Sequence, residues 1–118
     1  SNLAFDKSGI LLATGGSEDI TVWNFGGDGP EGSSPLSLKF HKKPITSLAF
    51  ANHSMNLASG SRDGGLVIWG LSTDDKEGGM CDTHVSDSIS NLYWHPNDTA
   101  IAALDRQGGV TIFFRGRV

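Results

Sequence analysis

Short apolar runs alternate with clusters of glycine, serine and aspartate along the 118-residue chain. Within these runs, apolar residues either alternate with polar ones or follow one another over a short stretch. Both patterns are typical of β-strands and differ from the 3.6-residue period of helices. The sequence therefore predicts an all-β protein, with strands at residues 3–5, 10–15, 20–25, 37–40, 45–51, 56–60, 66–70, 80–83, 89–94, 100–104 and 110–114.

A sequence repeat organises these strands. Its aromatic landmarks are Phe5, Phe50 and Trp94, which lie 45 and 44 residues apart, and Trp23, Trp69 and Phe113, which lie 46 and 44 residues apart. Repeats of this length are single supersecondary units, which bury their apolar faces by stacking on neighbouring units. We expect one domain over residues 1–118, with repeats at about 1–40, 41–83 and 84–118.

Four residues of the second repeat have a recognisable spacing. His41 precedes its first strand, Ser59 lies in the second, Asp63 lies in the following turn and Trp69 closes the third. This arrangement resembles the WD40 family, in which each repeat builds one four-stranded blade of a β-propeller. The resemblance implies a partial propeller of about three blades, the last without its outer strand. It also implies a buried polar tetrad, in which the Asp accepts from backbone N–H groups and the His ring, and the Ser joins His to Trp.

The outer two repeats depart from this pattern. The first has Thr14 and Trp23 at the tetrad positions, and either Glu18 or Asp19 must serve for the Asp. At the tetrad positions the third repeat has Ala103, Gln107 and Phe113, and its His84 lies one residue out of register. We therefore expect the third blade to be held by packing alone, and the middle repeat is the best match.

A serine, a histidine and an aspartate in one network also invite a hydrolase interpretation. Hydrolysis by a serine nucleophile needs an exposed serine oxygen and an oxyanion hole, and the chain has no G-x-S-x-G motif. The segment GSRDGG is not followed by the GK[ST] of a phosphate-binding loop. We therefore expect no enzyme activity and no cofactor.

The histidines and the cysteine are the candidate metal ligands. Cys81 and His84 form a C-x-x-H pair, whereas His53 and His95 lie in the first turns of different repeats. Because a zinc site needs about four converging ligands, we expect no metal site. A single cysteine also excludes an intrachain disulfide, which mildly favours a reducing compartment.

Charge and hydropathy restrict the classes of partner that the chain is expected to have. The formal net charge is -4 and the sequence pI is about 5.4, so there is no chain-wide electrostatic reason to expect nucleic acid as a partner. No apolar run approaches the roughly 20 residues needed to span a bilayer, and the start of the chain lacks the features of a signal peptide. We therefore expect no membrane partner and an intracellular location, in the cytoplasm or nucleus.

Basic residues lie where the WD40 resemblance places partner peptides, in the loops at one end of the blades. Lys42 and Lys43 precede the first strand of the second repeat, while Arg62 and Arg106 occupy equivalent turns 44 residues apart. Arginine pairs well with carboxylate and phosphate oxygens, so one hypothesis is an acidic or phosphorylated peptide. The alternative is that these are ordinary solvated charges. The acidic residues that would offset them are Glu18, Asp19, Asp63, Asp87 and Asp105.

Three blades are fewer than the roughly 4 to 8 that close a propeller. We therefore expect the outer faces to be covered, either by further blades of a longer chain or by identical copies. The resemblance implies a non-catalytic protein–protein interaction scaffold, part of a larger propeller or complex. The alternative is a structural segment that closes a propeller by homo-oligomerisation.

Overall fold

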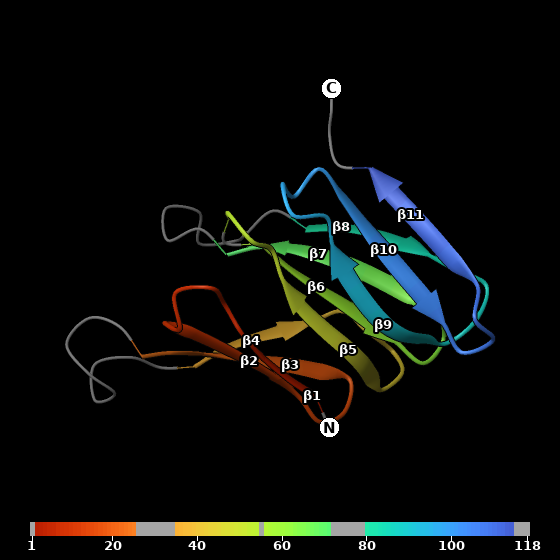
Figure 1. Ribbon diagram of the computed structural model, residues 1–118. Coiled ribbons are helices and arrows are strands. Elements are labelled where there is room, and N and C mark those ends of the chain that lie inside the picture. Colours follow the sequence, from red (N-terminus) through yellow and green to blue (C-terminus); the bar gives the residue numbers. More distant parts are fainter. Residues whose placement is uncertain (1, 26–34, 55, 72–79, 115–118) are drawn as a thin grey trace.

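The computed structural model describes residues 2–25, 35–54, 56–71 and 80–114, and the side chains of residues 80 and 81 are outside this description. In the described part every regular element is a β-strand. The strands form three antiparallel sheets, which lie side by side in the order of the sequence (Figure 1). The predicted all-β fold of propeller blades is confirmed.

Each sheet follows the chain from strand to neighbouring strand. The first sheet comprises β1 (Asn2–Phe5), β2 (Leu11–Gly15), β3 (Asp19–Asn24) and β4 (Leu36–Lys39). The second comprises β5 (Ile45–Phe50), β6 (Asn56–Ser61), β7 (Gly65–Gly70) and β8 (Met80–His84). The third comprises β9 (Ile89–Trp94), β10 (Ala100–Asp105) and β11 (Val110–Phe114).

No strand end differs from the predicted one by more than one residue. The largest consequence is at β8, which extends to His84 because this residue pairs with Gly65 across the sheet. His84 therefore lies in the second sheet. β6 likewise continues to Ser61, because Ser61 pairs with Ile45.

Two apolar layers hold the three sheets together. β1 lies beside β5, and β5 lies beside β9, so these first strands form the common inner edge of the stack. We call the face of a sheet that points to the preceding sheet its N-side face, and the opposite one its C-side face. Burial of these faces removes apolar surface from water, which is the main force that stacks the sheets. The first layer contains Leu11, Ala13, Ile20, Val22 and Leu38 of the first sheet and Ile45, Leu57, Val67 and Trp69 of the second. The second layer contains Ala58 and Leu66 of the second sheet and Ile89, Leu92, Ile101 and Ala103 of the third.

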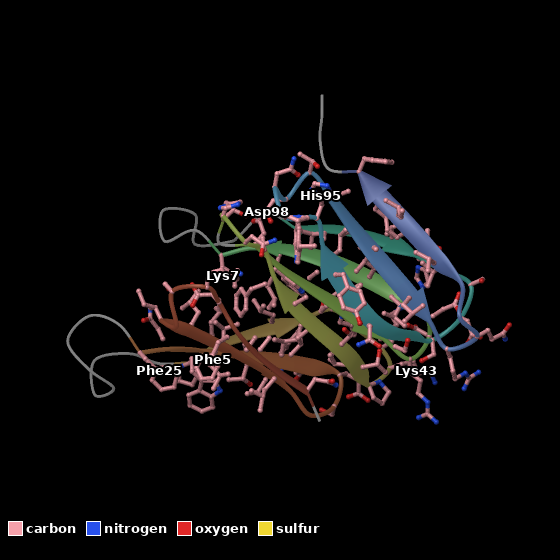
Figure 2. All side chains as sticks on the ribbon, viewed as in Figure 1. Phe5, Lys7, Phe25, Lys43, His95 and Asp98 are labelled. Carbon is pink, nitrogen blue, oxygen red and sulfur yellow. The ribbon has the colours of Figure 1, made fainter. Side chains whose placement is uncertain are left out.

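The two outermost faces of the stack expose large apolar side chains. On the N-side face of the first sheet, Phe5 is 54% exposed and Trp23 is 42% exposed. The Phe5 ring lies near that of Phe25, with centroids 6.5 Å apart, at the outer side of this sheet (Figure 2). On the C-side face of the third sheet, Tyr93 and Ile112 are similarly exposed. These faces correspond to faces that are buried between neighbouring sheets inside the stack.

Candidate functional site

A chain of buried polar groups runs through the second sheet. Ser59 on β6 is fully buried, and its hydroxyl oxygen lies 2.7 Å from Nε2 of His41. The same oxygen accepts a hydrogen bond of 2.9 Å from the indole N–H of Trp69, at the end of β7. His41 and Trp69 are also buried, so these bonds satisfy groups that water cannot reach.

Asp63 is attached to this network differently from what the resemblance implied. In the described structure its carboxylate accepts from the N–H of Gly65, at 3.0 Å, and from the Ser61 hydroxyl, and it makes no hydrogen bond with His41. Ser61 was missed in the sequence, although it lies two residues after Ser59 and so on the same face of the strand. A serine two residues before an aspartate in a tight turn is the local signal that could have revealed it.

The electrostatics fix the protonation states of the two titrating groups. Burial lowers the pKa of His41, the nearby Asp63 carboxylate opposes this change, and His84 adds to it. The Ser61 hydroxyl holds the pKa of Asp63 below its usual value, against the effect of burial, and the Gly65 N–H contributes in the same direction. At neutral pH His41 is therefore neutral and Asp63 is charged. Because Ser59 is closed to solvent, this set of groups can stabilise the sheet but offers no accessible nucleophile.

The turn between β6 and β7 also connects the second sheet to the third. Gly64 has φ of +89°, and a Cβ atom there would overlap the carbonyl oxygen of Val85. The Gly64 carbonyl in turn accepts a hydrogen bond of 2.9 Å from the N–H of Val85. Glycine is required here by both its backbone conformation and the close approach of the next loop.

The first sheet has a weaker version of the network. The indole N–H of Trp23 lies 3.4 Å from Thr14 Oγ1, and this pair is open to water. Of the two acidic candidates, Asp19 forms an exposed ion pair of 2.7 Å with Lys39. Neither Glu18 nor Asp19 makes a described hydrogen bond to Thr14 or Trp23.

The expectation that the third blade is held by packing alone is wrong. Asp105 accepts hydrogen bonds from the N–H groups of Gln107, at 2.9 Å, and Gly109, at 2.8 Å. Asp105 lies 44 residues after Ser61, so a single carboxylate accepts the hydrogen bonds of this turn, which Ser61 and Asp63 accept together in the second sheet. The repeat spacing places Gln107 at the acid position, so the acid at position 105 was not predicted to take part.

The basic candidates divide into two groups. Lys42, Lys43 and Arg62 are exposed, and the Arg62 N–H donates to the carbonyl of Pro44 at 3.0 Å, which places this turn beside the loop that carries the lysines. Arg106 is instead paired with Asp87, with 3.3 Å between Nη2 and Oδ1. Lys43 lies at the opposite end of the strands from His95 and Asp98 (Figure 2).

Other chemistry has little support in the described residues. No group of three or more His, Cys, Asp or Glu side chains there is placed to hold a metal ion. The same residues include no helix long and apolar enough to cross a membrane.

Comparisons with known proteins agree with this geometry. The family model for the WD domain, G-beta repeat, matches residues 32–70. The fold is similar to the β-propeller domain of Cps50 (Swd1) from Myceliophteria thermophila, with a TM-score of 0.76 and 20% identity over 95% of this chain and 34% of that one. The chain belongs to the WD40-repeat family. The matched residues include the buried network of His41, Ser59, Asp63 and Trp69.

Curated relatives of this WD40 chain are larger proteins. It is 42% identical over 82 residues to the chromatin assembly factor 1 subunit FAS2 homolog of Oryza sativa subsp. japonica, which covers 64% of this chain and 16% of that protein. It is 44% identical over 64 residues to the TSET complex member tstE of Dictyostelium discoideum, which covers 54% of this chain and 5% of that protein. It is 32% identical over 95 residues to the intraflagellar transport protein 122 homolog of Xenopus tropicalis, which covers 80% of this chain and 7% of that protein. The chain thus spans less than a fifth of each relative.

Proposed function

We propose that this chain is a non-catalytic protein–protein interaction scaffold built from WD40 repeats, and that it is part of a larger propeller or complex. The exposure of Trp23 carries this proposal: its counterpart Trp69 is covered by a neighbouring sheet and is 8% exposed, whereas Trp23 is 42% exposed. Such a face is stable when another protein surface covers it. Two relatives are named as a subunit of chromatin assembly factor 1 and a member of the TSET complex, which supports protein partners.

The exposed basic turns are the proposed partner site. Lys42, Lys43 and Arg62 form a local positive patch on a chain of net charge -4, and none of them is in a described ion pair. An acidic or phosphorylated peptide is the ligand that suits this charge, because carboxylate and phosphate oxygens pair strongly with guanidinium and ammonium groups. Arg106 belongs to the same proposal, but its pairing with Asp87 reduces its share. The relatives and the acidic balance of the chain support an intracellular location and a protein rather than a nucleic acid as partner.

Fluorescence anisotropy with a labelled acidic peptide, with and without phosphoserine, tests this site. Charge reversal at Lys42, Lys43 and Arg62 together should weaken binding by about tenfold or more, because three attractive charges become repulsive. Lys7→Glu is the matched control, since it reverses a charge in the turn after β1, at the other end of the strands. If the control weakens binding as much as the triple variant, the effect comes from net charge and the proposed site is wrong.

Homo-oligomerisation is the second candidate function, and the two apolar end faces favour it. Copies that cover each other's exposed faces would close a ring without a foreign partner. Light scattering of the chain across a concentration series separates the two functions. A mass that rises to a defined multiple would favour self-assembly, and a constant monomer mass would reject it.

A further inference from the structure

Both sheet-to-sheet contacts place an isoleucine over a glycine. A Cβ atom on Gly15, on the C-side face of the first sheet, would lie 3.0 Å from Ile45 Cγ2. A Cβ atom on Gly60, on the C-side face of the second sheet, would lie 2.7 Å from Ile89 Cγ2. The absence of a side chain at each glycine therefore makes the room that the isoleucine of the next sheet fills.

The third sheet has no such space for an isoleucine on its C-side face. Leu104 lies 44 residues after Gly60 and occupies the same place in its sheet. A leucine side chain fills the position where an isoleucine of a following sheet would enter. The equivalent cross-strand pairs are Asn2 with Gly15, Ser47 with Gly60, and Asn91 with Leu104.

On the same face, a large residue also replaces the small one found at a second equivalent position of the other two sheets. Ala4 and Ala49 occupy equivalent places on β1 and β5, and the corresponding residue of β9 is Tyr93. At the contact between the second and third sheets, the Trp94 indole N–H donates to the carbonyl of Ala49 at 2.9 Å, so an aromatic ring lies over the alanine. Tyr93 is 57% exposed and fills the place that such a ring would take.

We propose that the C-side face of the third sheet binds a partner β-sheet that has glycine or alanine opposite Leu104 and Tyr93. A partner sheet that carried the isoleucine of both internal contacts, or the aromatic residue of the second one, would collide with these two side chains, because a well-packed interface does not admit two large side chains in one place. Ile112 and Val110 on the same face are exposed and supply apolar area around the two positions. The proposal deepens the scaffold function by naming the kind of partner that fits this face, and it does not depend on the basic turns.

A second copy of this chain is a convenient probe of this rule. Its first sheet presents Phe5 at the place equivalent to Trp94, so stacking in the register of the internal contacts would bring Phe5 of one copy against Tyr93 of another. Wild-type chains should therefore not associate through this face, so this proposal and the homo-oligomerisation alternative exclude each other. The variant with Tyr93→Ala and Leu104→Ala should self-associate at least about tenfold more tightly in sedimentation equilibrium, although it exposes less apolar surface. A general attraction between apolar surfaces predicts the opposite order.

Further variants locate the association and guard against a folding defect. Ile112→Glu, added to the double variant, should abolish the association, whereas Gln107→Glu in an exposed turn of the same sheet should leave it intact. Phe5→Ala changes only an exposed residue of the first sheet and should tighten association on its own, because a small residue then faces Tyr93. Circular dichroism confirms that each variant is folded.

The proposal is overturned if the wild-type chain associates and Ile112→Glu stops it, or if neither Phe5→Ala nor the double variant tightens association. Peptide binding at the basic turns, measured on the same samples, separates this failure from a failure of the proposed peptide site. A change in mass reports on the sheet face, and a change in anisotropy reports on Lys42, Lys43 and Arg62.

Discussion

Replacing Ser59 with alanine tests the buried network most directly. The hydroxyl serves two partners, the His41 ring and the Trp69 indole N–H, in residues that are 7% and 8% exposed. Ser59→Ala leaves both groups unpaired and out of reach of water. A buried unsatisfied polar group costs about 1–3 kcal/mol, so with two such groups we expect the free energy of unfolding to fall by about 2–6 kcal/mol. Urea unfolding followed by circular dichroism measures this change, with an unchanged dependence on urea concentration.

Thr14→Val in the first sheet is the matched control. It removes the corresponding hydroxyl, but the bond from Trp23 is 3.4 Å long and open to water, so the loss should be below about 1 kcal/mol. A double variant adds a second check. With Trp69→Phe the indole N–H is absent, so the cost of Ser59→Ala in that background should be about 1 kcal/mol smaller. Equal costs at Ser59 and Thr14, or additive costs of Ser59→Ala and Trp69→Phe, would refute the argument that burial makes this network important.

Three other predictions follow from the same geometry. Burial lowers the folded-state pKa of His41, so the stability that this residue contributes is complete above about pH 6.5. It falls as the pH drops from there toward the folded pKa, by at most about 1.4 kcal/mol per pH unit. Unfolding measured as a function of pH should lose this slope in His41→Gln and keep it in the exposed-site variant His53→Gln. Gly64→Ala should destabilise far more than Gly108→Ala in thermal unfolding, because both have positive φ but a Cβ atom meets the neighbouring loop only at Gly64; similar losses would show that backbone strain alone matters. The carboxylate of Asp98 accepts hydrogen bonds from two backbone N–H groups of the turn after β5. Asparagine tolerates the φ of 64° at this position, so Asp98→Asn should lower the free energy of unfolding by about 1–3 kcal/mol through the carboxylate alone. A loss below about 0.5 kcal/mol would contradict this.

The acid sensitivity of Asp98 has a different range from that of His41. Burial alone would raise the pKa of Asp98, but the N–H groups of Asn52 and His53 hold it below its usual value. Its contribution is therefore complete above its unfolded pKa of about 3.9 and is lost as the pH falls further. The two groups thus act in separate pH ranges.

The strands and the repeat could be predicted because their signals are local or periodic, and the partners of Ser59 were implied by the resemblance to the WD40 family. A period-two pattern marks a strand, and a constant interval between aromatic residues fixes equivalent positions in successive sheets. His41, Ser59 and Trp69 then fall at known places in one repeat. The ends of β8 and β6 were not predicted, because His84 and Ser61 extend these strands only through pairing with residues on another strand.

The remaining features depend on neighbours that are distant in the sequence. Trp23 and Trp69 are the same residue at equivalent positions, yet one is exposed and the other buried, because only Trp69 has a sheet against it. Arg106 resembles Arg62 in sequence, but its partner Asp87 comes from the loop before β9. The sequence by itself determined the strands and their repeat, through side-chain alternation and turn chemistry. Tertiary structure decided which side chains are covered and which charges are paired, because burial and ion pairing are set by the surface that arrives from another sheet.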